Sequence, residues 1–399
     1  MGAVRGNVVI GQSGGPTHVI NQSLVGVVEA AIGAPGVGAV WGALHGVKGV
    51  LEERFIDLGR ESKATLEAVA QTPGAALRSV RKKPTREECE RALEVFARRN
   101  VRYFFYIGGN DSAETAHILN ELALAKGYEL ALFHVPKTID NDLRVTDHCP
   151  GYGSAARYVA LSFLGDNADV RSLPGVKLNV VMGRNAGWLT AASALARQHA
   201  DDGPHLIYLP ERTFSVERFV ADVAAVQARL GRCICAISEG IHNERGELIA
   251  ASNEVDSHGN VQLSGSGALG DRLSATLKAH LGDKLRVRAD TFGYAQRSFP
   301  GVASEVDARE AREAGRAALR AATGGEHLNG SIALLRNSNA PYSVRYERVE
   351  LRSVARETRP MESELIRGDN DVAPAFLDYV RPLVGELPQL ARLSDFPVS

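Results

Sequence analysis

The sequence has few cysteines, few aromatic residues and no long apolar run. Its 399 residues include 4 cysteines, and aromatic residues make up 6%. The cysteines form neither a Cys-x-x-Cys pair nor a metal-binding spacing with histidine, and Cys233 and Cys235 alternate along an apparent strand, so we expect reduced core residues. No apolar run reaches the roughly 18 residues of a membrane span, and the N-terminus lacks the pattern of a signal peptide. We therefore expect a soluble, cytoplasmic protein with no membrane partner.

Neither positively nor negatively charged residues are in excess. The chain has 46 Lys and Arg residues against 47 Asp and Glu residues. This balance argues against a general nucleic-acid or membrane-surface protein, so any basic feature must be local. The length exceeds what one ordinary core accommodates and predicts two domains.

Strand patterns alternate with helix patterns through most of the chain. Apolar strands are expected at residues 7–11, 37–44, 101–107, 130–135, 177–181, 205–209, 233–237, 285–290 and 332–335. Helical patterns separate most of them, and Thr85 with Glu88 forms a capping box at the start of one helix. This order predicts an α/β fold of parallel sheets with helices on both faces.

Glycines and polar residues gather where the expected strands end. Gly14 and Gly15 stand between a strand and a helix, where free N–H groups suit a phosphate, although their spacing matches no known nucleotide loop. Gly109 follows the strand at 101–107, and the three residues after it are expected to cap a helix from about residue 113. The basic residues at 78, 81, 82 and 83 lie between two prolines, which predict a loop. Their charges either are solvated or converge on an anion.

The densest polar cluster is Lys137, Asp140 and Asp142, directly after Pro136 ends a buried strand. In an open parallel sheet, ligands lie beyond the carboxyl ends of the strands, which makes this loop a candidate site. Because the two aspartates are two residues apart, an extended loop would point them the same way, toward one cation or one hydroxyl. The alternative is a solvated turn that caps the next helix.

Taken as a series, the strand-end loops over about residues 7–340 resemble the phosphofructokinase family. The run Thr138-Ile139-Asp140-Asn141-Asp142 is its most specific motif. The resemblance implies two Rossmann-like three-layer domains with mainly parallel sheets and an active site in the cleft between them. Residues 1–151, with about 298–346 returning, would hold the phosphoryl donor, and 152–297 would hold fructose 6-phosphate. Residues 347–399 form a C-terminal extension of unknown role.

The resemblance also implies roles for individual residues. Asp140 would be the general base for the sugar's 1-hydroxyl, Thr138 would contact the transferred phosphoryl group, and Arg81 would be the transition-state arginine. A Mg²⁺ ion would lie near Asn110, Asp140 and Asp142. The other substrate-binding residues implied are Gly14, Gly15, Gly109, Asp111, Met182, Gly183, Arg184, Glu239, Tyr294 and Arg297, with Arg288 reaching a neighbouring subunit of a homodimer or homotetramer.

Two positions resemble the pyrophosphate-dependent branch of the family, because Asp111 and Lys137 stand where nucleotide-using members have glycine. A carboxylate at 111 repels an adenylate phosphate, while Lys137 pairs with the short, highly charged pyrophosphate. The implied reaction is reversible and converts fructose 6-phosphate and pyrophosphate into fructose 1,6-bisphosphate and phosphate. The alternatives are an ATP-dependent 6-phosphofructokinase, an NAD-kinase-like enzyme and a non-catalytic regulatory paralogue.

Two departures from the family pattern concern the metal and the subunit interface. Asn110 replaces an aspartate near the metal, so the resemblance does not define the full set of metal ligands. Gly175, seven residues before Met182, stands where tetrameric relatives place a second cross-subunit arginine, and Lys177 is the nearest cation. The resemblance therefore does not define the subunit interface either.

Overall fold

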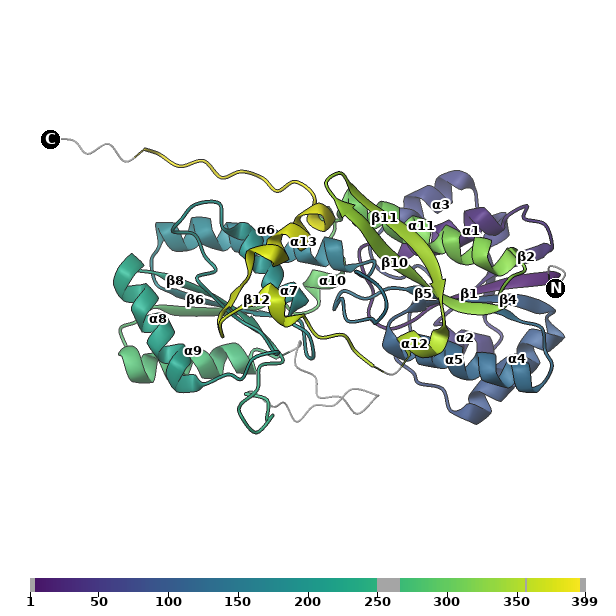
Figure 1. Ribbon diagram of the computed structural model, residues 1–399, viewed down its shortest axis with the longest axis horizontal. Helices are drawn as coiled ribbons and strands as arrows, with labels where there is room; N and C mark the ends of the chain where they lie inside the picture. The colour runs from purple at the N-terminus through teal and green to yellow at the C-terminus, as the bar shows by residue number, and fades with distance from the viewer. Residues whose placement is uncertain (1–3, 250–265, 356, 395–399) are drawn as a thin grey trace.

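The structure is a computed structural model that describes residues 4–249, 266–355 and 357–394. The chain forms two lobes side by side, each built on one β-sheet (Figure 1). Within these described ranges, no helix is long and apolar enough to cross a membrane.

The first lobe contains a seven-stranded sheet with helices on both faces. Its strand order is β11-β10-β5-β4-β1-β2-β3, and all neighbours are parallel except β2 with β3 and β10 with β11. The strands are β1 (Gly6–Gln12), β2 (Val37–Ala43), β3 (Phe55–Asp57), β4 (Val101–Gly108), β5 (Ala131–Pro136), β10 (Asn329–Asn339) and β11 (Tyr342–Val349). One face packs against α1 (Ile20–Ala31), α3 (Lys63–Ala70) and α11 (Glu305–Thr323), and the other against α2 (Val47–Leu51), α4 (Arg86–Arg98) and α5 (Asn110–Ala125).

The second lobe contains a four-stranded parallel sheet in the order β7-β8-β6-β9. Its strands are β6 (Val176–Val181), β7 (Leu206–Tyr208), β8 (Cys233–Ser238) and β9 (Val287–Thr291). One face packs against α6 (Tyr152–Ser172), α7 (Trp188–Ala192) and α13 (Pro374–Val384), and the other against α8 (Val216–Leu230) and α9 (Ala268–Leu281). Successive residues of β8 belong alternately to the two cores, as expected for a strand buried on both faces.

These observations confirm the predicted α/β fold with mainly parallel sheets and helices on both faces. The capping box of Thr85 and Glu88 is present at the start of α4. All four cysteines are free and buried, as predicted.

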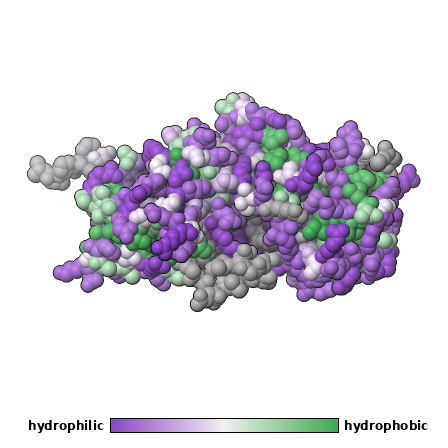
Figure 2. All heavy atoms as spheres, turned by 60° about the horizontal axis from the view of Figure 1, so that its bottom comes forward, coloured by the Kyte–Doolittle hydropathy of each residue, from purple (hydrophilic) through white to green (hydrophobic). Residues whose placement is uncertain are grey.

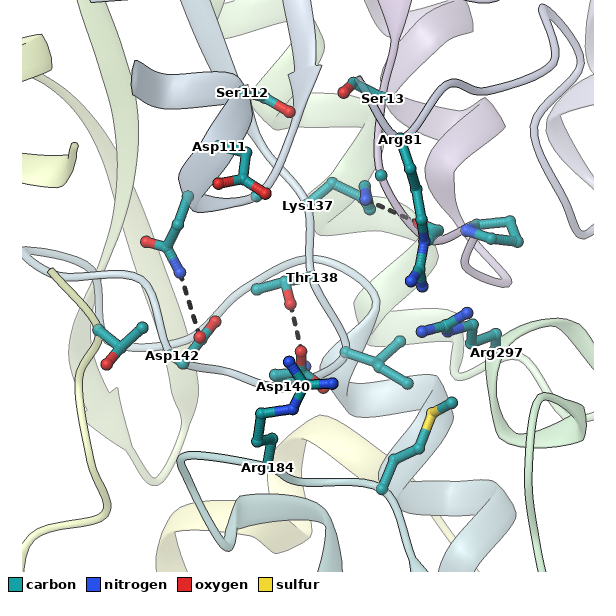
Figure 3. Close-up of a pocket in the computed structure, with 18 of the residues that line it drawn as sticks. Ser13, Arg81, Asp111, Ser112, Lys137, Thr138, Asp140, Asp142, Arg184 and Arg297 are labelled. Carbon is teal, nitrogen blue, oxygen red and sulfur yellow. Dashed lines mark hydrogen bonds between the residues drawn. The ribbon is translucent and has the colours of Figure 1, made fainter. Parts of the chain in front are cut away.

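The predicted start of the helix after β4 is wrong. Helix α5 begins at Asn110, its N-cap is Gly109, and no side chain caps it. Asn110, Asp111 and Ser112 therefore lie in the first turn of the helix rather than before it. Their side chains are available for the space beyond the end of β4, where Figure 3 shows Asp111 and Ser112.

The extension after β11 connects the two lobes. It begins with α12 (Leu351–Val354), which packs on α5 in the first lobe. It then reaches the second lobe, where it forms the β12 (Ile366–Arg367) and β13 (Asp371–Val372) pair and helix α13. Phe376, Val380 and Leu383 of α13 are buried in the core beside α6 and α7. The extension is thus an integral part of both lobes.

Candidate active site

A cavity of about 370 Å³ lies between the lobes, at the carboxyl ends of strands from both sheets. Figure 2 shows the hollow between the lobes, with hydrophilic residues along its visible rim. The sequence-predicted residues that line the cavity are Gly14, Gly15, Arg81, Gly109, Asn110, Asp111, Lys137, Thr138, Asp140, Asp142, Met182, Arg184, Glu239, Tyr294 and Arg297. They come from loops far apart in the sequence, and the two sheets bring them together.

Two sequence-predicted residues do not line this cavity. Gly183 has a φ of 144°, and a Cβ there would lie 2.5 Å from the Ala186 carbonyl oxygen, so glycine is needed to shape the turn. Arg288 lies on β9, where it pairs with Asp169 and donates a 3.3 Å hydrogen bond to the Leu173 carbonyl. The role of Arg288 in a neighbouring subunit stays a prediction.

The cavity also contains residues that sequence reasoning did not assign to it. They are Ser13, Pro16, Val80, Lys82, Ser112, Ile139, Asn185 and Thr358. Most are sequence neighbours of predicted residues, so a wider reading of each strand-end loop would have found them. Thr358 comes from the C-terminal extension, where no motif marked it.

Lys137 lies in a buried position on the side of the cavity that the first lobe forms. Its side chain is 3% exposed, and Nζ donates a 2.7 Å hydrogen bond to the Gly15 carbonyl oxygen (Figure 3). Burial lowers the pKa of Lys137 to about 7, and the nearby Arg297 guanidinium acts in the same direction. An anion in the cavity would restore the ammonium form. The side chain is therefore suited to bind a highly charged anion.

The two glycines at the end of β1 leave room for these cations. A Cβ on Gly14 would lie 3.2 Å from Lys137 Nζ, and one on Gly15 would lie 3.0 Å from the Arg297 guanidinium. Gly14 also has a φ of 76°, in the left-handed region that glycine adopts without strain. The loop thus places backbone and two positive charges close together.

The aspartate loop is not extended, because Asn141 has a φ of 57°. The prediction that an extended loop aligns its two aspartates is therefore wrong about the backbone, although Asp140 and Asp142 both line the cavity. The Asp140 N–H donates a 3.1 Å hydrogen bond to Thr138 Oγ1, which fixes the start of the turn. Burial, together with the nearby charge of Asp140, raises the pKa of Asp142 to about 7.

Asn110 completes a group of oxygen atoms suited to a divalent cation. Its Nδ2 donates a 3.1 Å hydrogen bond to Asp142, while its Oδ1 is buried and has no hydrogen-bond partner in the described part of the chain. A buried carbonyl oxygen of this kind is normally paired, and a cation would pair it. Among the described residues, no group of three or more His, Cys, Asp and Glu side chains is arranged to hold a metal ion. The residues present thus fit a cation that keeps water or substrate ligands.

The opposite wall is built by loops after β6, β8 and β9. A Cβ on Gly240 would lie 2.0 Å from the Arg184 carbonyl oxygen, so the loops that carry Arg184 and Glu239 pack directly on each other. The Arg297 guanidinium lies 4.9 Å from the centre of the Tyr294 ring. In Figure 3, Arg184 and Arg297 both point toward the space beside Asp140. The wall therefore presents guanidinium groups to an anionic ligand.

Comparison with known proteins identifies this arrangement, because the family described as Phosphofructokinase matches residues 7–322. The chain belongs to the phosphofructokinase family. A relative from Rhodospirillum rubrum, named pyrophosphate--fructose 6-phosphate 1-phosphotransferase, is 52% identical and covers 98% of this chain and 97% of its own length. A relative of the same name from Xanthomonas campestris is 41% identical over 98% of this chain and 94% of its own.

A solved structure agrees with this assignment. The pyrophosphate-dependent phosphofructokinase from Nitrosospira multiformis superimposes with a TM-score of 0.86 at 34% identity, covering 98% of this chain and 95% of that one. The family match includes every cavity-lining residue except Thr358. In this phosphofructokinase, carboxylates on one loop therefore face guanidinium and ammonium groups on the others, an arrangement suited to phosphoryl transfer.

Proposed function

We propose that this protein transfers a phosphoryl group reversibly from pyrophosphate to the 1-hydroxyl of fructose 6-phosphate, giving fructose 1,6-bisphosphate and phosphate. The observation that carries the proposal is the buried Lys137 ammonium site, which shares the cavity with Asp111. The names of the relatives from Rhodospirillum and Xanthomonas support the same donor.

The donor is selected by charge and space. Asp111 is exposed in the first turn of α5, where it would meet the α-phosphate of ATP. A carboxylate in this place repels that phosphate and fills its space. Lys137 favours a compact anion, because its ammonium is desolvated and gains most from a ligand of high charge density. Together these two residues favour pyrophosphate over ATP.

The chain's own residues supply the base and the positive charge for the transfer. Asp140 accepts the proton of the 1-hydroxyl, and Thr138, hydrogen-bonded to the Asp140 N–H, contacts the transferred group. Arg81 and Lys137 offset the charge that spreads over the phosphoryl oxygens in the transition state. Met182, Arg184, Glu239, Tyr294 and Arg297 hold the sugar phosphate on the opposite wall.

The expected cofactor is Mg²⁺, held by Asp140, Asp142 and Asn110 Oδ1. When bound, the cation would supply positive charge that offsets the charge of pyrophosphate. The proposal assigns the donor to residues 1–151 with about 298–346, and fructose 6-phosphate to residues 152–297. A cytoplasmic homodimer or homotetramer, in which Arg288 serves a neighbouring site, belongs to the same proposal.

An activity assay tests the proposal. Purified protein is incubated with fructose 6-phosphate and Mg²⁺, with either pyrophosphate or ATP, and fructose 1,6-bisphosphate is measured. Product is expected with pyrophosphate and not with ATP, and the reverse reaction should consume phosphate. Equal rates with ATP would support the ATP-dependent alternative. No product with either donor would support the non-catalytic one.

A further inference from the structure

The aspartate loop contains a strained backbone that is held partly by residues outside the loop. Between β5 and α6, Asn141 has a φ of 57° and Val145 a φ of 63°. Asparagine tolerates the left-handed region, but a β-branched residue there is a true outlier. Such conformations persist where the surroundings hold them, and they gather at functional sites. Two side chains of the C-terminal extension, Tyr379 and Arg359, contact the left-handed turn at Asn141 directly.

Tyr379, on α13, joins the two ends of the loop through its hydroxyl group. It accepts a 2.8 Å hydrogen bond from Asn141 Nδ2 and donates a 2.9 Å hydrogen bond to the Asp147 carbonyl. The Asn141 side chain is fully buried, and its Oδ1 accepts from the Cys149 N–H at 2.9 Å. Rotation of Asn141 out of the left-handed region would break these contacts. The Tyr379 hydroxyl therefore opposes a change in the residue between Asp140 and Asp142.

Arg359 holds the same loop by its carbonyl oxygens. Its guanidinium donates to the carbonyls of Thr146, at 2.6 Å, and Asn141, at 3.2 Å. Its backbone N–H donates to the Asp142 carbonyl at 2.7 Å. The guanidinium also lies 4.7 Å from the centre of the Trp188 ring, in the core of the second lobe. Arg359 thus binds both sides of the left-handed turn and ties it to α7.

The extension itself is anchored independently of the loop. Helix α13 packs into the core beside α6 and α7, and Tyr379 lies 5.3 Å from the Trp188 ring. Neither Tyr379 nor Arg359 lines the cavity, whereas Thr358, next to Arg359, does. These two side chains are therefore placed to act on the aspartates through the loop, without touching a substrate.

We propose that Tyr379 and Arg359 are positioning residues for phosphoryl transfer: they hold Asn141 in its left-handed conformation and thereby direct the Asp140 and Asp142 carboxylates into the cavity. This inference rests on the proposed function, because it assigns the two aspartates their catalytic roles. Loss of position in a transfer reaction lowers turnover more than substrate affinity. A residue needed only for folding would lower stability and leave the turnover of the folded fraction unchanged.

The test compares Tyr379→Phe with Tyr208→Phe in the full-length protein. Tyr208 donates a 2.9 Å hydrogen bond to Asp222 in the core around α8 and lies outside the cavity, so its variant also loses one hydroxyl group. Tyr379→Phe is expected to lower kcat roughly tenfold or more, with KM values for both substrates changed by less than about threefold. Tyr208→Phe should keep the wild-type kcat.

Two further measurements complete the experiment. Arg359→Lys keeps the charge but loses the planar fork that reaches two carbonyls, so its kcat should fall in the same way. Limited trypsin digestion measures opening of the loop independently of activity, because Arg144 in the loop is exposed. Cleavage after Arg144, identified by mass spectrometry, should be faster in Tyr379→Phe than in Tyr208→Phe. Wild-type kcat in both Tyr379→Phe and Arg359→Lys would overturn the inference. Inactive wild-type protein would overturn the proposed function instead.

Discussion

Asn110 and Asp142 are joined by a 3.1 Å hydrogen bond from the amide Nδ2 to a carboxylate oxygen, at the point where α5 meets the aspartate loop. This bond orients the amide so that its Oδ1 is buried without a partner within the described residues. The amide therefore stabilises the charged form of Asp142 while offering a neutral oxygen to a cation. Replacing this one group changes both functions in a predictable direction.

The first prediction is that Asn110→Asp strengthens Mg²⁺ binding and lowers the thermal stability of the Mg²⁺-free protein. A third carboxylate adds attraction for the cation but repels Asp140 and Asp142 when the cation is absent. The Mg²⁺ concentration for half-maximal turnover should fall by about tenfold, equivalent to about 1.4 kcal/mol. The Tm measured in a chelator should also fall. An unchanged Mg²⁺ dependence would mean that residue 110 lies outside the metal shell.

The second prediction concerns the proposed base. Asp140→Asn keeps the size of the side chain but cannot accept the hydroxyl proton, so turnover should fall by at least about 100-fold with little change in KM for fructose 6-phosphate. Rates are compared at saturating substrate, and a Tm close to that of the wild type serves as the folding control. Near-normal turnover would remove Asp140 from the base role.

The third prediction concerns the sugar phosphate. Arg297→Lys should raise KM for fructose 6-phosphate far more than KM for pyrophosphate, because a lysine cannot replace the two-pronged contact of a guanidinium with phosphate. Steady-state kinetics with each substrate varied in turn provide the measurement. Arg297 also approaches Gly15 in the first lobe, so equal losses for both substrates would contradict the prediction. They would make Arg297 a general structural residue.

The fourth prediction is a change of phosphoryl donor. Asp111→Gly should admit ATP, with a gain of tens to hundreds of fold that reflects a repulsion of about 2 to 3 kcal/mol. Lys137→Gly should mainly lower pyrophosphate-dependent turnover, and the double variant should prefer ATP. Asp111→Asn is the matched control, because it removes the charge and keeps the bulk. If Asp111→Gly neither binds nor uses ATP, another feature excludes the nucleotide.

The fifth prediction concerns pH and stability at His148, which is buried between two carboxylates. Its Nδ1 lies 2.7 Å from Asp147 and its Nε2 lies 2.6 Å from Glu310, with the Tyr342 hydroxyl 3.4 Å away; Arg336 also pairs with Asp147. Burial alone lowers the pKa of His148, but the hydrogen bonds to the two carboxylates outweigh it and raise the pKa above its usual 6.5.

A raised pKa in the folded state fixes the direction in which stability changes with pH. The stabilisation from the charged imidazole is fully present below pH 6.5 and is lost as the pH rises through the folded pKa. The Tm should therefore fall as the pH rises above 6.5, and it should fall less steeply in His148→Asn than in the wild type. Parallel pH profiles for the two proteins would show that His148 does not carry this dependence.

The parts of the site that were predictable from sequence are those governed by local pattern. Apolar strand patterns that end in glycine or proline predicted the loops around Gly14, Gly109 and Lys137. A parallel sheet places the carboxyl ends of its strands at one edge, so these loops were expected to lie together. The family motif then gave the individual residues. The start of α5 was misjudged because Asn110 is a favoured cap residue, whereas Gly109 holds that place in the fold.

The contacts of the extension were not predictable, because they join distant parts of the chain. Asn141 and Tyr379 are 238 residues apart, and neither belongs to a periodic pattern that points to the other. The left-handed φ of Asn141 is likewise set by these partners, since asparagine is also common in extended loops and turns. Only the folded structure reveals such a pairing.

The position of Arg359 and Tyr379 in the chain has a consequence for biosynthesis. Every sequence-predicted residue of the cavity precedes them, so a ribosome completes the substrate-binding loops before it makes the residues that fix the aspartate turn. A product released before residue 359 would contain the cationic residues of the cavity but lack the contacts that position Asp140, the proposed base. Such a fragment would also lack the α13 side chains that complete the core of the second lobe, so the late synthesis of the extension couples activity to completion of the chain.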